Sequence, residues 1–208
     1  MLELLGLLLL GFAVGLSGAV IPGPLLAFVI LDSTKKRKVT GHFVILGHAI
    51  WEALVIGLIL LGLSAVMKQY STIIYVIGGA AMIIIGTFMV KNRNVEAKME
   101  SSKVNSSTLG GVFYTAFNPT QPIWWATAGL ALLLEGSKIM GAMGIAIVTA
   151  GHWLADLAYY ALVSYIVYRY GKYINPWQKQ LSIVFGVFLT VLGIYFITLG
   201  TTEWLMIT

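Results

Sequence analysis

The sequence GHAIWE at residues 47–52 recurs as GHWLAD at residues 151–156, and each copy lies inside a long apolar stretch. Both copies hold a histidine and, four positions later, a carboxylic acid. Four residues are close to one helical turn, so each histidine and its acid are expected on the same face of a helix. A polar pair that recurs in this way indicates an internal repeat with a candidate site inside it.

The composition indicates a membrane protein. Hydrophobic residues make up 59% of the 208-residue chain and charged residues 10%, whereas about 25% charged residues are usual in soluble domains. Six apolar stretches are long enough to cross a bilayer as helices: 4–31, 39–67, 69–90, 104–134, 139–168 and 180–202. The chain has no cysteine, which excludes disulfides, cysteine-ligated metals and a cysteine nucleophile.

The basic residues predict how the chain is oriented. The loops after the first, third and fifth stretches hold 11 of the 13 lysines and arginines. Cytoplasmic loops carry such an excess, so we expect both termini outside the cytoplasm. The net charge of +5 then needs no nucleic acid as a partner. Met1-Leu2-Glu3 lacks the positive start of a signal peptide, and we interpret the first stretch as a permanent helix.

The two halves of the chain share three landmarks in the same order. Paired prolines interrupt the first helix of each half, within 22–24 and 118–122, and the histidine–acid motif follows in the second helix. Glycines seven apart mark the third helix, Gly79 with Gly86 and Gly186 with Gly193. Glycine and proline are also common in membrane helices in general, which is the alternative explanation.

These landmarks predict an all-α membrane protein with six transmembrane helices, arranged as a 3+3 inverted-topology repeat with proline-broken first and fourth helices. Residues 1–208 form a single transport domain, with repeats at 1–90 and 109–208 and a linker at 91–108. Each repeat has an odd number of spans, so the second enters the membrane in the opposite sense. This architecture is typical of secondary transporters.

Glu52 and Asp156 are the only acids inside the apolar stretches, where an ionised carboxylate costs about 2.5 to 3.5 kcal/mol on insertion scales. Together with His48 and His152, whose imidazoles titrate near neutral pH, they are candidates for proton coupling. Two other interpretations stay open. The pairs can lock two helices together, or the two imidazoles and two carboxylates can bind a divalent metal ion such as zinc, nickel or cobalt.

The broken helices are candidates for substrate binding. A break frees backbone groups that lipid cannot satisfy, and the N-terminus of a half-helix suits a carboxylate. A kink used only for packing is the alternative. The candidate residues are Pro22, Gly23, Pro24, Asn118, Pro119, Thr120, Gln121 and Trp124. Trp51, Trp125 and Trp153 lie at a similar depth and either line a pocket or face lipid.

The sequence resembles the LysE/RhtB family of amino-acid exporters over nearly its whole length. The likeness rests on the following residues: Gly11, Gly15 and Gly18 leading into 22–24, the basic turn after them, Glu52, the third-helix glycine pairs, and Asn118-Pro119 followed by Trp124-Trp125. It implies a six-span inner-membrane exporter that removes amino acids using the proton gradient. The chain differs from the family pattern at Glu52, where Asp is usual, and at Thr120, where Lys is frequent.

We therefore expect a secondary transporter that exports amino acids or similar small zwitterions across the cytoplasmic membrane by proton antiport, with no cofactor and no enzyme activity. Its partners are the substrate, the proton and the lipid bilayer, and homo-oligomerisation stays open. The alternative is a divalent metal exporter, since other branches of the same superfamily handle metals. A membrane enzyme or electron carrier fits least, because the chain has no cysteine beside its prolines and no nucleotide motif.

Overall fold

The computed structural model describes residues 2–20, 23–63, 70–91, 106–118 and 120–207, and all secondary structure in these residues is helical. The longer helices are α1 (Leu2–Ala19), α2 (Pro24–Lys36), α3 (Gly41–Leu58), α5 (Ser71–Lys91), α6 (Ser107–Ala116), α8 (Leu130–Arg169) and α10 (Gln178–Ile207). The short segments are η1 (Ile59–Leu63), α7 (Thr120–Trp124), η2 (Trp125–Gly129), α9 (Gly171–Ile174) and η3 (Asn175–Trp177).

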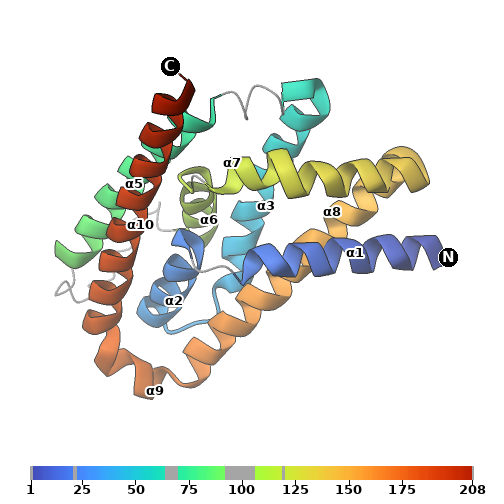
Figure 1. Ribbon diagram of the computed structural model, residues 1–208. Helices are drawn as coiled ribbons and strands as arrows, with labels where there is room; N and C mark the ends of the chain where they lie inside the picture. The colour runs from blue at the N-terminus through green and yellow to red at the C-terminus, as the bar shows by residue number, and fades with distance from the viewer. Residues whose placement is uncertain (1, 21–22, 64–69, 92–105, 119, 208) are drawn as a thin grey trace.

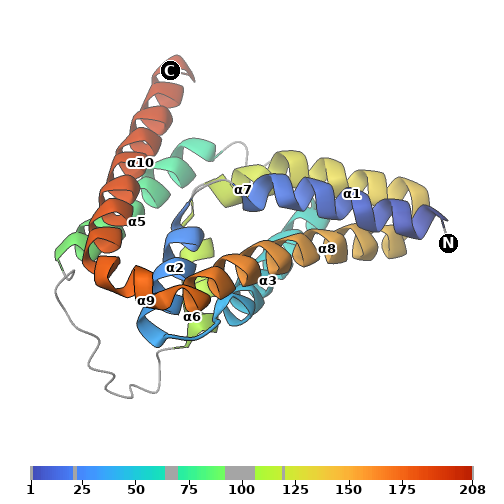
Figure 2. The same cartoon turned by 90° about the horizontal axis from the view of Figure 1, so that it is seen from below.

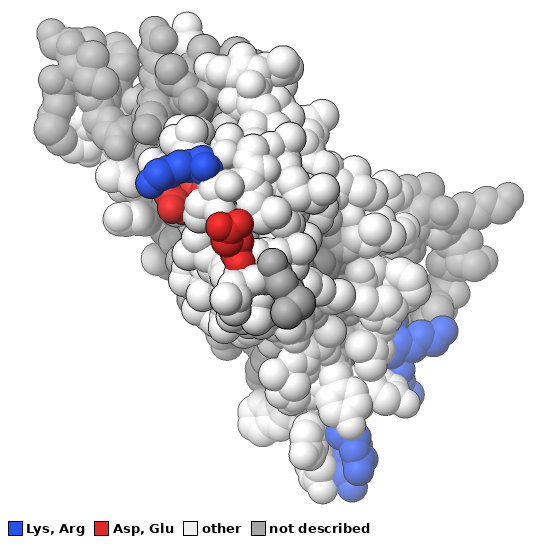
Figure 3. Space-filling model, turned by 90° about the vertical axis from the view of Figure 1, so that its right-hand side faces the viewer, with Lys and Arg blue, Asp and Glu red and all other residues white. Residues whose placement is uncertain are grey.

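Within the described residues, five segments are long and apolar enough to cross a membrane: Leu2–Ala19, Gly41–Gly62, Thr72–Lys91, Thr120–Arg169 and Lys179–Thr202. Their outward surface is apolar, as lipid contact requires. Ile84 and Phe88 on α5 and Val184 on α10 are each more than half exposed. On the face shown in Figure 3, charged side chains are confined to a few places. The prediction of an all-helical membrane protein is confirmed.

Helical structure stops and restarts in the first and fourth apolar stretches (Figure 1). α1 ends at Ala19 and α2 begins at Pro24. Proline is well tolerated at the first position of a helix, because an N–H group there would have no acceptor within the helix. α6 ends at Ala116 and α7 begins at Thr120. Pro22 and Pro119 lie outside the described residues, as do residues 92–105 of the predicted linker.

The long helix after α7 turns back on itself. Its backbone is non-helical at Met140 and at Gly141, where φ is +59°, a conformation that favours glycine. On either side of this turn Gly136 and Gly144 pack backbone to backbone, which makes the antiparallel hairpin at the right of Figure 1. The predicted fourth span ends at residue 134, but the helix runs on and the chain reverses only where glycine permits it.

Glycines bring pairs of helices into close backbone contact. α1 lies along α8, α6 along α3, and α5 beside α10 (Figures 1 and 2). Small residues let membrane helices approach closely in this way. The contacts include Gly11 with Val148, Gly111 with Val44, Gly79 with Gly193 and Gly86 with Gly186.

A third acid is buried although it lies outside the predicted spans. The carboxylate of Asp32 pairs with Lys36 at 2.8 Å and accepts a hydrogen bond from the hydroxyl of Ser107 at 2.8 Å. Its side chain is buried because α2 continues to Lys36 and the start of α6 packs beside it. Charge compensation by Lys36 is the reason that this acid can be buried.

Candidate functional site

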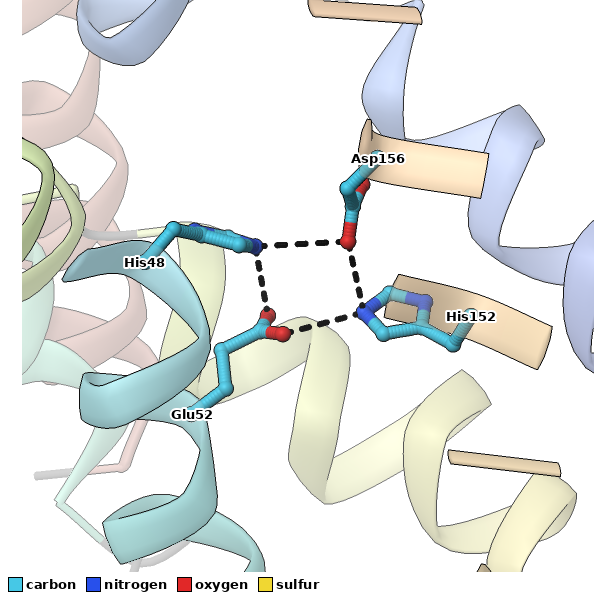
Figure 4. A group of neighbouring side chains, drawn as sticks. All are labelled: His48, Glu52, His152 and Asp156. Carbon is cyan, nitrogen blue, oxygen red and sulfur yellow. Dashed lines mark hydrogen bonds and ion pairs between the residues drawn. The ribbon is translucent and has the colours of Figure 1, made fainter. Parts of the chain in front are cut away.

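Two histidines and two carboxylates meet between α3 and α8 (Figure 4). His48 and Glu52 come from α3, and His152 and Asp156 come from α8. The Nε2 atom of His48 lies 3.2 Å from Oε1 of Glu52 and 3.4 Å from Oδ2 of Asp156. The Nε2 atom of His152 lies 3.1 Å from Oε2 of Glu52 and 3.3 Å from Oδ2 of Asp156. Imidazole and carboxylate therefore alternate around a closed set of four, which we call the His-acid ring.

The His-acid ring is shielded from the surface. Its members have exposed fractions between 2% and 8%. Helical periodicity places each histidine one turn from its own acid, but only the packing of α3 against α8 closes the ring. Close contacts hold these helices, since Gly15 of α1 lies against His152 and Gly47 of α3 lies against Thr108 of α6.

Two tryptophans hold the carboxylate of Glu52. The indole N–H of Trp125 donates to Oε1 at 2.8 Å, and that of Trp153 donates to Oε2 at 3.0 Å. Each oxygen of Glu52 thus accepts a hydrogen bond from an indole N–H and also lies near an imidazole. The sequence does not predict this role, because Trp125 is 73 residues from Glu52. The one signal available is that both tryptophans lie near the polar motifs.

A threonine of α6 orients one of the imidazoles. The hydroxyl of Thr115 donates to the carbonyl of Gly111 at 2.7 Å. Since a hydroxyl has a single proton, Oγ1 of Thr115 can only accept from Nδ1 of His48, which lies 2.9 Å away. Nδ1 of His48 therefore carries a proton.

With Nδ1 protonated, a neutral His48 would present the lone pair of Nε2 to carboxylate oxygens of Glu52 and Asp156. Lone pairs that face each other repel, so contacts of 3.2 and 3.4 Å require one further proton, on Nε2 or on one of the acids. The geometry thus gives the His-acid ring at least one proton that its members can exchange. Imidazole is suited to such exchange near neutral pH.

The second imidazole has no comparable anchor. Nδ1 of His152 is buried and has no hydrogen-bond partner among the described residues. Gly15 occupies the place beside His152 that Thr115 occupies beside His48, and glycine has no hydroxyl to offer. His48 is therefore held in one orientation by α6, whereas the imidazole of His152 is hydrogen-bonded only through Nε2, to Glu52, within the described residues.

Thr115→Val tests this assignment of protons. The variant keeps the shape of the side chain but removes the acceptor of His48, so a neutral His48 can place its proton on Nε2 and donate it to the ring. The contacts of His48 with Glu52 and Asp156 then no longer require an additional proton on Nε2 or on one of the acids. For the proton-coupled transport that the sequence predicts, we expect the pH of half-maximal flux in reconstituted vesicles to fall by about one unit, which corresponds to a hydrogen bond of roughly 1.5 kcal/mol.

Thr87→Val is the matched control, because the exposed hydroxyl of Thr87 also bonds to a carbonyl of its own helix but touches no histidine. We expect this control to keep the pH profile of the unmodified protein. A Thr115→Val profile that coincides with the control would contradict the proton assignment.

A pocket of about 200 Å³ adjoins the His-acid ring, and all four ring members line it together with Thr115. Six of the predicted substrate-binding residues also line it: Gly23, Pro24, Asn118, Thr120, Gln121 and Trp124. The other two, Pro22 and Pro119, lie outside the described residues. Residues that the sequence did not single out complete the wall, among them Tyr160, Leu192 and Phe196. Trp51 instead packs against an apolar core cluster.

The His-acid ring is also the donor set of the metal alternative, since its four ligand atoms lie within 4.8 Å of one another. The contacts do not favour a metal ion over shared protons. Each Nε2 already lies 3.1 or 3.2 Å from an oxygen of Glu52, and each of these two oxygens also accepts a hydrogen bond from an indole N–H. A metal-bound histidine also needs a partner for its other nitrogen, which His152 lacks within the described residues.

Comparison with known protein families gives a match over most of the chain. The family model described as LysE type translocator matches residues 16–200. This range contains the His-acid ring, both helix breaks and the α5 helix. No curated protein and no solved structure matches the chain.

Proposed function

Because the chain belongs to the LysE type translocator family, we propose that it exports amino acids or similar small zwitterions across the cytoplasmic membrane by proton antiport. Family membership and the apolar helices identify it as a multi-pass membrane protein that functions in transport. The substrate class, the use of the proton gradient and the direction of export are the proposal.

The observation that supports the proposal is that the His-acid ring and both helix breaks line one pocket. When a ligand and an exchangeable proton share a site, each can change the affinity for the other, and this linkage is what coupled transport needs. The pocket volume of about 200 Å³ is below the roughly 300 to 1,000 Å³ of drug-sized sites. A small metabolite suits this volume.

Contacts between helices support a 3+3 inverted repeat. In an alignment of the two repeats, Gly11 corresponds to Gly111 and Val44 corresponds to Val148. The contact of Gly11 with Val148 is then equivalent to the contact of Gly111 with Val44. The first half-helix of each repeat thus packs on the second helix of the other repeat, as a two-fold axis would place them. Two further pairs of contacts are equivalent by the same two-fold symmetry. Gly47 with Thr108 corresponds to Gly151 with Leu8, and Gly79 with Gly193 corresponds to Gly86 with Gly186.

In this arrangement residues 1–90 and 109–208 are the repeats of one transport domain, and residues 91–108 join them. Arg37, after α2, and Lys172 of α9 line one small surface pocket, so basic turns from the two repeats lie at the same end of the molecule. An excess of basic residues marks the cytoplasmic side. This supports an orientation with both termini outside the cytoplasm.

Flux measurements in vesicles test the proposal. Purified protein is reconstituted into vesicles loaded with labelled amino acids, and efflux is followed with and without an imposed pH gradient. We expect at least one uncharged amino acid to leave faster with the gradient, and an ionophore that collapses the gradient to abolish the difference. Vesicles without protein provide the baseline.

A panel of amino acids with no gradient-dependent efflux would contradict the proposal. Gradient-dependent flux of Zn²⁺ in the same vesicles, with none of amino acids, would support the metal alternative in its place. Measuring both in one preparation separates the two transport functions, because the protein, lipid and gradient are then identical.

A further inference from the structure

Gln121 of α7 is a buried polar side chain whose amide makes no hydrogen bond in the part of the chain that the structure describes. It is 6% exposed, and neither Nε2 nor Oε1 of its amide has a hydrogen-bond partner among the described residues. Leaving a buried polar group unpaired costs about 1 to 3 kcal/mol. The side chain lines the pocket beside the His-acid ring, so a ligand in the pocket can offset this cost by bonding to the amide.

The N-terminus of α2 lines the same pocket. Gly23 occupies the N-cap position of this 13-residue helix and supplies no side-chain cap. Pro24 has no N–H, so the backbone donors at the helix start belong to Leu25 and Leu26. The positive end of the helix dipole adds to them. At the other break, by contrast, the Asn118 side chain accepts the N–H of the residue that begins α7.

The pocket also contains an acceptor for a cation. Oδ2 of Asp156 makes no hydrogen bond among the described residues, although it lies 3.4 Å and 3.3 Å from the two imidazoles. The remaining wall includes the apolar side chains of Trp124, Leu192 and Phe196, and no lysine or arginine of the described chain lines it. Donors, an anionic acceptor and an apolar surface are thus present in one small cavity.

We propose that the start of α2 and the amide of Gln121 form a subsite for the carboxylate of an α-amino acid. The ammonium group of that ligand binds at Asp156, and an uncharged side chain packs against Leu192 and Phe196. This inference rests on the proposed transport function and adds the part of the pocket that recognises each end of the substrate. Gln121 is in this scheme a specificity residue. Its Nε2–H group donates a hydrogen bond to the carboxylate of the substrate.

Gln121→Leu tests the subsite, because leucine has nearly the same size and removes both amide atoms. The probes are L-leucine, L-leucinamide, which lacks the carboxylate, and 4-methylpentanoate, which lacks the amine. Binding to the purified full-length protein is measured by calorimetry. We expect the unmodified protein to bind leucine more tightly than either analogue. We expect Gln121→Leu to weaken leucine binding by about 10- to 100-fold, as the loss of a hydrogen bond to a charged group implies, and to leave leucinamide binding unchanged.

Thermal unfolding of the same variant separates this role from a structural one. Since the amide has no hydrogen-bond partner among the described residues, its removal should leave the unfolding temperature unchanged or raise it, whereas a structural glutamine would lower it. Gln180→Leu, at an exposed position on α10, is the matched control and should change neither binding nor stability.

Equal loss of leucine and leucinamide binding, or no loss of either, would overturn the subsite, as would an unmodified protein that binds none of the three probes. The proposed function fails separately. Vesicles that show no gradient-dependent amino-acid flux would contradict transport even if leucine binds through Gln121, and normal flux with unchanged selectivity would contradict only the subsite.

Discussion

Glu52→Gln is expected to reduce gradient-dependent flux by more than about 100-fold. The carboxylate of Glu52 accepts indole protons from Trp125 and Trp153 and faces both imidazoles of the His-acid ring. An amide replaces one acceptor oxygen with a donor, so at least one of these N–H groups loses its partner, and the negative charge of the ring falls by one. Breaking a buried charged pair costs about 3 to 5 kcal/mol, and roughly 1.4 kcal/mol corresponds to a factor of ten.

Flux is measured per folded molecule, with the folded fraction taken from size-exclusion chromatography before reconstitution. Glu135→Gln is the matched control, because Glu135 is partly exposed on α8 and pairs with Lys138 only at 3.9 Å. Surface pairs of this kind contribute little, so we expect near-normal flux. Glu52→Asp keeps the charge and should retain measurable flux, which guards against a variant that fails only because it does not fold. Normal flux in Glu52→Gln would exclude a role for this carboxylate in proton coupling.

Gly15→Ala is expected to lower both the thermal stability and the flux. A Cβ at this position would lie 2.8 Å from Cα, 2.9 Å from the carbonyl oxygen and 2.7 Å from Nδ1 of His152. Two of these atoms are backbone, so α1 must move away from α8 and His152 must shift within the His-acid ring. Overpacking of this kind costs about 1 to 3 kcal/mol. Thermal unfolding of the purified protein and flux in vesicles are the two measurements.

Gly6→Ala is the matched control on the same helix, since a Cβ at Gly6 would have no neighbour within 4 Å. Alanine also favours helix over glycine, so this variant should be as stable as the unmodified protein or slightly more so. If Gly15→Ala proves as stable and as active as Gly6→Ala, the close approach of α1 to His152 is wrong.

Much of the architecture follows from local patterns in the sequence. The apolar stretches predict the membrane helices because each residue adds its own transfer free energy, independently of distant partners. The four-residue spacing of His48 and Glu52 predicts one shared helical face, and the structure places their side chains 3.2 Å apart. α2 begins at Pro24, within the predicted break at 22–24, for a similarly local reason, because proline is favoured in the first turn of a helix.

Boundaries were less predictable where two local signals competed. The predicted fourth span ends at residue 134, yet the helix continues through Glu135 and Lys138 and the chain reverses at Met140 and Gly141. Charges at a membrane surface do not stop a helix, whereas a positive φ does. The burial of Asp32 was also not predictable from its neighbours in the sequence, because Ser107, which donates a hydrogen bond to it, lies on another helix.

The sequence by itself determined the membrane class, the approximate spans, the repeated histidine–acid motif and the family resemblance, because hydropathy and helical periodicity are properties of neighbouring residues. Only the tertiary structure decided that the two motifs close into one ring, that Trp125 and Trp153 hold Glu52, and that the amide of Gln121 is unpaired within the described part of the chain. His152 and Glu52 are 100 residues apart, and their distance depends on how closely glycines let α1, α3, α6 and α8 approach. Such contacts belong to packing between helices, which no local pattern encodes.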